Sequence, residues 1–233
     1  MTEAADTEPQ EWVLPLVVRI ERGDPPSRTD ALEAAAVAVL TLLDDPRATS
    51  GEWAPAVRAW QDAHIRKVVR RARGAPWRTA SELPGITVAR GGAEVRVYPP
   101  IPLDGWPREL AKLQVGGTEL DDPEPPAAPP PGMPVLWLNP GVEMSAGKEM
   151  AQVGHGAQLA WWSMDDARRK EWAAAGFPLA VRLAAADAWP ELAASGRPVV
   201  QDGGFTEIAP GTCTVVADVP ADPASWPRTE APG

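Results

Sequence analysis

Three side chains in the second half of the chain are of types that often take part in catalysis. Lys148 lies in SAGKEMAQVGHGAQLAWW (145–162), and Asp202 and Thr206 lie close together in QDGGFTEIAPGT (201–212). A lysine can stabilise a developing oxyanion, a carboxylate can accept a proton from water, and a hydroxyl can orient that water. The joint placement of Lys148, Asp202 and Thr206 makes these three residues candidates for a reactive site.

The position of Lys148 favours a specific role for this side chain. Ser145 is a good N-cap, so Lys148 falls in the first turn of a helix, where the helix dipole disfavours a cation. Only 4 of the 22 basic residues are lysines. At this position we expect the ammonium to lie beside free backbone N–H groups, which together could bind an oxyanion or a phosphate.

Other kinds of catalytic centre have little support. The chain has one Cys and two histidines, His64 and His155, so it has no internal disulfide and lacks the usual ligands of a zinc site. We expect no metal and no cofactor. A serine nucleophile would need a histidine base, and we prefer direct attack by water. His155, on a small-residue helix face, is either a hydrogen-bonded core residue or a site residue.

Strands and helices alternate in the second half, which predicts a layered α/β sheet. We expect strands at 134–139, 177–184, 198–201 and 212–219, one helix beginning after Ser145 and a short one at 187–196. The first half has the same order. Its expected elements are a strand at 15–20, a helix at 27–45, a strand at 66–73, a helix at 77–85, and strands at 86–89 and 94–99.

Sequence spacing supports an internal duplication. Pro15 precedes Thr29 by the same 14 residues that separate Pro134 from Lys148. VARGG (88–92) then aligns with VQDGG, which puts Asp202 opposite Arg90. We interpret the chain as two repeats with a period of roughly 115 residues. Two unrelated α/β units of similar order would explain the same pattern.

The expected domain boundaries follow from the repeats and from the composition of the segments between them. We expect an acidic tail (1–10), a first repeat (11–120), a Pro-rich linker (121–133), a second, catalytic repeat (134–220) and a flexible tail (221–233).

The motifs MSAGKEMAQVGHGA and QDGGFTEIAPGT resemble those of the second class of peptidyl-tRNA hydrolases. The resemblance covers 134–220 and implies a small mixed sheet of four strands per repeat with helices on both faces, hence two three-layer α/β/α repeats packed as a pseudo-dimer. It implies that Lys148 is the catalytic lysine, acting with Asp202 and Thr206. The other implied substrate-binding positions are Ser145, Gln152, His155, Gly203 and Gly204.

The resemblance implies hydrolysis of the ester bond of peptidyl-tRNA, releasing tRNA and peptide. Three positions depart from the family pattern, where Ala146 replaces a lysine, Phe205 an arginine and Glu207 a glutamine. The alternative is therefore a module with weakened or no activity that binds tRNA or a protein. A small-molecule hydrolase that reuses the site is a third, less supported possibility.

Charge is distributed unevenly along the chain. The net charge is −10, which argues against non-specific binding of nucleic acid. Residues 11–120 nevertheless carry 15 basic and 14 acidic side chains, whereas 134–220 carry 6 and 10. The densest basic stretch is HIRKVVRRAR (64–73), and we expect Arg66, Arg70 and Arg71 to contact tRNA. The alternative is a solvated basic segment paired with nearby acids.

No segment has the features of a membrane span or a secretion signal. The most apolar run, 31–43, is too short to cross a bilayer, and the first ten residues are acidic and polar. We expect a cytoplasmic monomer with tRNA as its partner.

Overall fold

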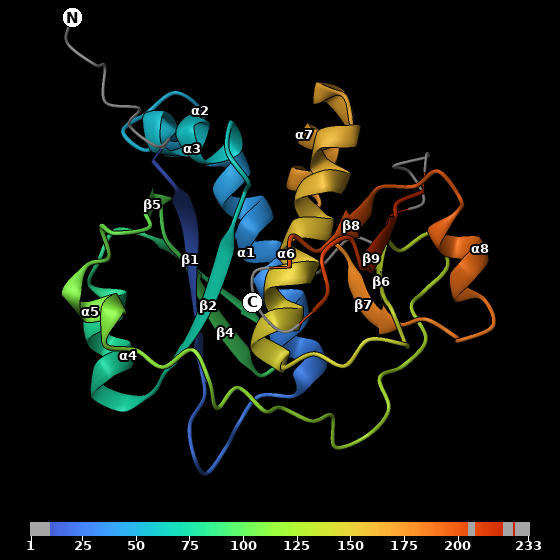
Figure 1. The fold of residues 1–233 in the computed structure, drawn as a ribbon, viewed down its shortest axis with the longest axis horizontal. Coiled ribbons are helices and arrows are strands. Elements are labelled where there is room, and N and C mark those ends of the chain that lie inside the picture. Colours follow the sequence, from blue (N-terminus) through green and yellow to red (C-terminus); the bar gives the residue numbers. More distant parts are fainter. Residues whose placement is uncertain (1–9, 205–207, 221–225, 227–233) are drawn as a thin grey trace, which may run out of the picture.

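Two mixed β-sheets flank a central pair of helices (Figure 1). The computed structural model describes residues 10–204, 208–220 and 226. The strands of the first sheet are β1 (Trp12–Arg19), β2 (Lys67–Ala72), β3 (Ile86–Arg90), β4 (Ala93–Val97) and β5 (Ile101–Pro102). Those of the second sheet are β6 (Val135–Leu138), β7 (Ala180–Leu183), β8 (Val199–Gln201) and β9 (Cys213–Asp218).

The longest helices are α1 and α6, one in each half of the chain. The helices of the first half are α1 (Arg28–Asp44), α2 (Pro46–Thr49), α3 (Ala54–Gln61), α4 (Gly74–Ser81) and α5 (Arg108–Ala111). Those of the second half are α6 (Ala146–Ser163), α7 (Asp166–Ala174) and α8 (Trp189–Ala193). The sequence did not predict α2, α3, α5, α7 or β5; the other elements lie where they were expected, with ends shifted by a few residues.

The two sheets have the same topology, as the predicted fold class requires. Their strand orders are β2-β1-β4-β3 and β7-β6-β9-β8, and β5 adds to the first sheet beside β1. In each sheet the first two strands named are parallel and the other neighbours antiparallel. The protein therefore consists of two similar α/β units, which is consistent with a pseudo-dimer.

Strand register defines which residues of the two sheets are equivalent. Across the first sheet, Val88 pairs with Val95 and Val95 with Val18. Across the second, Val200 pairs with Val215 and Val215 with Leu138. Continuing this register to the outer strands makes Lys67 and Val69 of β2 equivalent to Leu179 and Val181 of β7.

Both long helices begin with a serine N-cap. The Ser27 side chain accepts a hydrogen bond from the backbone N–H of Asp30, and that of Ser145 accepts one from Lys148. This cap satisfies one of the N–H groups that a helix start leaves without a partner. When the two caps are aligned, Lys148 is equivalent to Asp30. The gapless sequence alignment instead pairs Lys148 with Thr29, one residue earlier. The two alignments differ because the loops after β1 and β6 differ in length.

A single core joins the two halves, because α1 and α6 pack against each other between the sheets. Glycines in α6 allow this close packing. A Cβ on Gly154 would lie 3.1 Å from Val39 of α1, and one on Gly156 would lie 2.8 Å from Val215 of β9. Gly154 thus allows α6 to pack closely against α1 of the other repeat, and Gly156 allows it to pack closely against the sheet of its own repeat.

Helices cover both faces of the first sheet. Leu14, Leu16 and Val18 of β1 contribute to the large core with α1. Val17 points to the opposite face, where it packs in a smaller cluster with α4 and α5. This alternation along β1 is the two-residue periodicity of a strand buried on both sides.

The Pro-rich linker is anchored at its start. Asp122 accepts hydrogen bonds from the backbone N–H and the hydroxyl of Thr29, both at 2.8 Å. The carboxylate thus contacts the first turn of α1, where a negative charge is favourable. Among the described residues, no helix is both long enough and apolar enough to cross a membrane.

Candidate functional site

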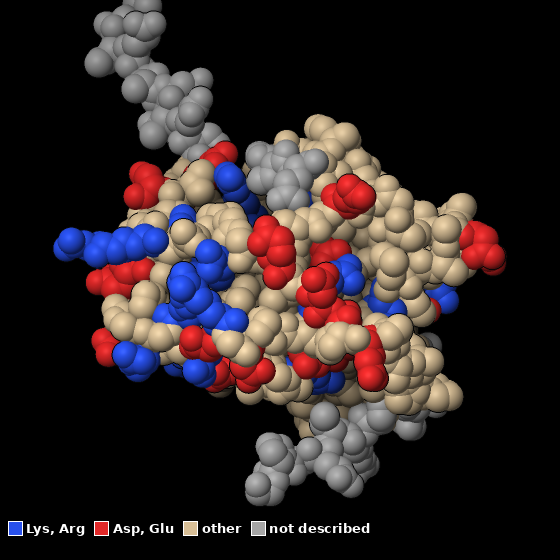
Figure 2. Space-filling view, turned by 90° about the horizontal axis from the view of Figure 1, so that it is seen from below, with Lys and Arg blue, Asp and Glu red and all other residues tan. Residues whose placement is uncertain are grey.

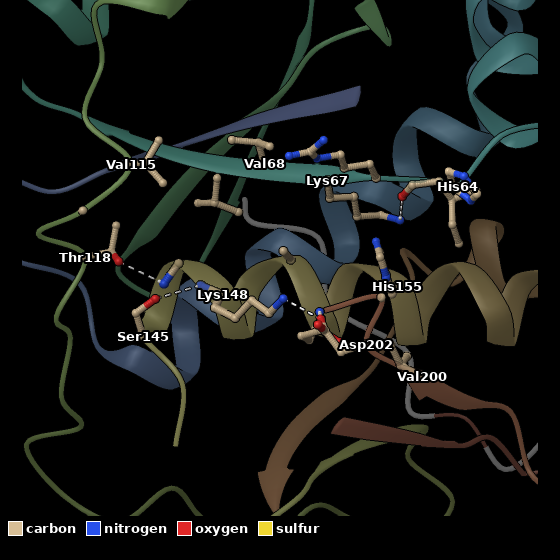
Figure 3. Close-up of a pocket in the computed structure, with 18 of the residues that line it drawn as sticks. His64, Lys67, Val68, Val115, Thr118, Ser145, Lys148, His155, Val200 and Asp202 are labelled. Carbon is tan, nitrogen blue, oxygen red and sulfur yellow. Dashed lines mark hydrogen bonds and ion pairs between the residues drawn. The ribbon is translucent and has the colours of Figure 1, made fainter. Parts of the chain in front are cut away.

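A cavity of about 610 Å³ lies between α6 of the second repeat and β2 of the first (Figure 3). Its wall includes the first turns of α6, the strand β2 with the residues before it, segment 115–119, and the turn after β8. Of the predicted site residues, the cavity wall contains Ser145, Lys148, Gln152, His155, Asp202, Gly203 and Arg66.

Lys148 and Asp202 form an ion pair in the wall of this cavity. Lys148 Nζ lies 2.5 Å from Asp202 Oδ2, and their side chains are 13% and 4% exposed. The fold brings them together because α6 starts beside the end of β8, where the chain turns at Asp202. The cation is therefore fixed by a carboxylate beside the cavity instead of pointing into solvent.

Gln152 extends this pair into the protein interior. Its Nε2 donates to Asp202 Oδ2 at 2.8 Å, and its Oε1 accepts from the Thr214 hydroxyl of β9 at 2.5 Å. Gln152 lies one helical turn after Lys148, so both side chains reach the same carboxylate. Gln152 and Thr214 are buried, which makes the network rigid.

The turn after β8 holds Asp202 from the other side. Gly204 N–H donates to Asp202 Oδ1 at 2.8 Å. Gly204 has φ of +76°, and a Cβ there would lie 2.3 Å from the Pro210 ring, so only glycine fits. Gly203 lines the cavity beside it. Thr206, the third predicted catalytic residue, lies outside the described residues.

The expectation of free N–H groups at the start of α6 is wrong for two of them. The N–H of Gly147 donates to the Thr118 hydroxyl at 3.0 Å, and that of Lys148 donates to the Ser145 hydroxyl at 3.3 Å. Thr118 comes from the first repeat and is almost fully buried. Ser145 is therefore a helix cap that also lines the cavity, and an oxyanion would depend chiefly on the Lys148 ammonium.

His155 and Lys67 lie together at the other end of the cavity (Figure 3). Burial lowers the pKa of His155 well below its ordinary value; the nearby positive charge of Lys67 lowers this pKa further, and a hydrogen bond with the Ile65 backbone opposes both effects. Nε2 of His155 is buried, with no hydrogen-bond partner among the described residues. His155 is thus a neutral imidazole that faces Lys67.

Lys67 is a buried lysine without a carboxylate partner among the described residues. Its Nζ donates to Gln158 Oε1 at 2.6 Å and to the Ile65 carbonyl at 3.3 Å, and lies 4.8 Å from the centre of the Trp60 ring. Burial lowers the pKa of Lys67 well below its ordinary value, because the charged form loses its hydration.

The three predicted tRNA-binding arginines already have partners in the protein. Arg66 pairs with Glu11 at 3.3 Å. Arg70 donates to the carbonyls of Ala111 and Leu113 and stacks on an aromatic ring, and Arg71 donates to the Gly116 carbonyl at 2.9 Å. Arg66 lines the cavity, whereas Arg70 and Arg71 do not.

The first repeat carries opposite charges at the equivalent positions. Asp30 stands where Lys148 stands, and Arg90 where Asp202 stands. Asp30 accepts a hydrogen bond from the N–H of Gly92 at 2.9 Å, whereas Arg90 lies 3.8 Å from Glu33 and donates to the Leu179 carbonyl. Arg90 thus faces the second repeat, and the first repeat has no counterpart of the Lys148–Asp202 pair.

Neither protein-family models nor the sequences of curated proteins give a match to this chain. The site therefore has to be judged on its own geometry. Sequence reasoning missed Thr118, Thr214 and the burial of Lys67. Thr214 is a polar residue inside the apolar run TCTVVADV, which is a usable signal; nothing near Thr118 indicates its contact with α6.

Proposed function

We propose that this protein hydrolyses the ester bond of peptidyl-tRNA at the Lys148–Asp202 pair. The observation that carries the proposal is a lysine ammonium fixed by a carboxylate in the wall of a cavity of about 610 Å³. Cavities of this size commonly hold small-molecule ligands. Such a space suits the terminal nucleoside and ester of the substrate, with the body of the tRNA outside.

Lys148 is the group that stabilises the oxyanion. An ammonium has three hydrogens, and one of them points to Asp202. The others remain for the ester carbonyl oxygen as it gains negative charge. A fixed cation in a site with little water is worth far more to a transition state than one in bulk solvent.

Asp202 orients Lys148 and accepts a hydrogen bond from the attacking water. An ionised carboxylate has about four acceptor positions. Three are taken by Lys148, Gln152 and the N–H of Gly204. The fourth can accept a hydrogen bond from the attacking water and then its proton, which passes to the ribose oxygen as the ester C–O bond breaks, so no covalent intermediate is needed.

The charge around the cavity suits an anionic substrate. Two cationic side chains, Arg66 and Lys148, line it against two carboxylates, Glu119 and Asp202, and the buried amine of Lys67, whose pKa is lowered, adds little positive charge. The whole protein has a net charge of −10, so this surround is more basic than the average surface. A cavity with balanced charge in so acidic a protein repels phosphates less than the rest of the surface does.

The body of the tRNA would bind along the first repeat. Figure 2 shows Lys and Arg side chains gathered on the left part of one face, on the side of the first sheet, with Asp and Glu side chains interspersed among them. The β2 arginines would reach phosphates while keeping their present partners, because a guanidinium has five donor hydrogens.

The alternative function is binding without hydrolysis. It is favoured by the Thr118 and Ser145 hydroxyls, which occupy two backbone donors that an oxyanion site could have used. Release of free tRNA from purified N-acetyl-aminoacyl-tRNA separates the two functions. Hydrolysis supports the enzyme, and tight binding with an intact ester at high protein concentration supports the binding module.

A further inference from the structure

The outer edge of β2 presents backbone groups to the cavity. The N–H of Leu14 donates to the Arg66 carbonyl, and that of Ile20 donates to the Ala72 carbonyl. In a parallel pair, the alternate residues of β2 therefore bond to β1, and the backbone groups of Lys67, Val69 and Arg71 point the other way. Lys67 and Val69 both line the cavity.

A short stretch of chain covers only one end of this edge. The N–H of Arg71 donates to the Gln114 carbonyl at 2.9 Å. The chain then leaves β2, and Val115 is 54% exposed. It reaches α6 at Thr118, whose hydroxyl accepts from Gly147. Among the described residues, the backbone N–H and carbonyl groups of Lys67 and Val69 have no hydrogen-bond partner.

The equivalent edge in the second repeat is closed by side chains. Val181, the counterpart of Val69, donates its N–H to Glu33 Oε1 at 3.2 Å. The carbonyl of Leu179, the counterpart of Lys67, accepts from Arg90 Nη2 at 3.2 Å. Backbone groups at these two equivalent positions thus have hydrogen-bond partners in the second repeat and, within the part of the chain that the structure describes, have none in the first.

The open edge of β2 lies at residues that are buried, so its backbone groups are expected to have a hydrogen-bond partner. Lys67 and Val69 are 7% and 4% exposed as whole residues. Buried backbone groups are almost always paired, and leaving them unpaired is costly. The apolar side chains beside them, Val68, Val115 and Leu159, line the same cavity and offer no hydrogen bonds.

We propose that the open edge of β2 at Lys67 and Val69 binds an extended peptide, which adds to the first sheet as a short strand. This inference rests on the proposed function, under which the peptide is the peptidyl part of the substrate. Two alternate positions about 7 Å apart accommodate roughly three residues. Main-chain pairing of this kind binds a peptide largely independently of its side chains, as a nascent peptide requires.

The geometry of the cavity places such a peptide beside the reactive pair. In Figure 3, Lys67 lies above His155, and Val68 lies nearer to Lys148. The strand β2 therefore runs from the His155 end of the cavity towards the Lys148 end. A peptide paired along it would have one terminus near Lys148, where its ester would lie, and the other near His155.

A binding experiment tests the peptide site without any need for hydrolysis. N-acetyl-trialanine amide is added to the ¹⁵N-labelled full-length protein, and backbone amide shifts are followed. The N–H signals of Lys67 and Val69 should move downfield in a saturable way. That of Val181, whose N–H is already bonded, is the internal control and should not move. Saturable changes elsewhere with none at Lys67 and Val69 would overturn the proposal, as would no change up to the solubility limit of the peptide.

A kinetic experiment then links the peptide site to the proposed function. Trialanyl-tRNA is compared with forms that are N-methylated at one amide or at the next. Because alternate amides of a strand face opposite edges, one methyl group should raise KM about tenfold and the neighbouring one should have little effect. Equal effects at both amides would overturn the edge pairing. If no ester is cleaved while the amide shifts occur, the peptide site stands and the proposed hydrolysis is wrong.

Discussion

Lys148 Nζ and Asp202 Oδ2 lie 2.5 Å apart although 54 residues separate them in the chain. The contact joins the first turn of α6 to the turn that follows β8. The same two places in the first repeat hold Asp30 and Arg90, which turn to other partners. Among the described residues, only the second of the two similar units has this ion pair, and the first unit completes the cavity beside it.

Replacing Thr214 by valine should destabilise the fold and loosen the site. The substitution keeps the volume but leaves Gln152 Oε1 without its buried donor, which costs about 1–3 kcal/mol. Urea unfolding measures this loss, and Thr214→Ser is the matched control because it keeps the hydroxyl. If valine and serine gave the same free energy of unfolding, the Gln152–Thr214 hydrogen bond would contribute nothing.

His155 should make stability depend on pH below neutrality. Burial lowers its pKa in the folded protein, whereas in the unfolded chain the pKa is near 6.5. Between those two values the unfolded chain binds more protons, so stability rises with pH and is lost as pH falls below about 6.5.

The measurement is the free energy of unfolding of the wild type minus that of His155→Gln, from pH 5 to 8. We expect this difference to be constant near pH 8 and to shift against the wild type as the pH is lowered. A difference that did not vary with pH would mean that His155 titrates normally in the folded state.

Much of the fold could be predicted because it follows from local pattern. Ser27 and Ser145 cap helices where an N-cap residue precedes an apolar periodic run, and the glycine pairs after β3 and β8 mark equivalent turns. The short helices α2 and α3 escaped prediction because four to eight residues carry too little periodicity.

The site was harder to predict than the fold because it lies between the repeats. Lys148, Gln152 and Asp202 could be found from motifs within one repeat. Thr118 and Lys67 reach the cavity from the other repeat, and no local pattern encodes how two repeats pack. The strand predicted at 66–73 is confirmed as β2 (Lys67–Ala72), but the pattern did not indicate that Lys67 would be buried.

Glu149→Ala should weaken the packing of the two repeats. Glu149 of α6 accepts two hydrogen bonds from Arg28 of α1, at 2.7 and 2.5 Å, and its side chain is 7% exposed. Removing the carboxylate leaves Arg28 partly buried and unpaired, so we expect a loss of about 2 kcal/mol in the free energy of unfolding. Arg197→Ala, which removes an ion pair within the second repeat, is the comparison. Its ion pair with Asp218 is more exposed, and its loss should be smaller; equal losses would contradict the special importance of the Arg28–Glu149 pair.

tRNA binding should weaken steeply with salt, and the β2 arginines should account for much of the slope. Each phosphate contact contributes about 0.7–0.9 to the slope of log affinity against log salt concentration. Replacing Arg66, Arg70 and Arg71 by glutamine should therefore flatten it by about two to three units. Arg197→Gln, an exposed arginine of the second repeat, is the control and should leave the slope unchanged. An unchanged slope in the triple variant would show that the β2 arginines do not contact the tRNA phosphates.

The most direct test of the account is the release of free tRNA from N-acetyl-aminoacyl-tRNA by the wild type and by Lys148→Met. Methionine nearly keeps the length of the side chain and lacks the ammonium, so kcat/KM should fall by about 10²- to 10³-fold. The variant leaves the buried Asp202 without its cation, so its melting temperature should also fall, and both proteins are assayed at a temperature at which circular dichroism shows them folded. The account predicts catalytic release by the wild type and almost none by the variant. Equal release by both proteins, or no release by the wild type at any concentration, would contradict it.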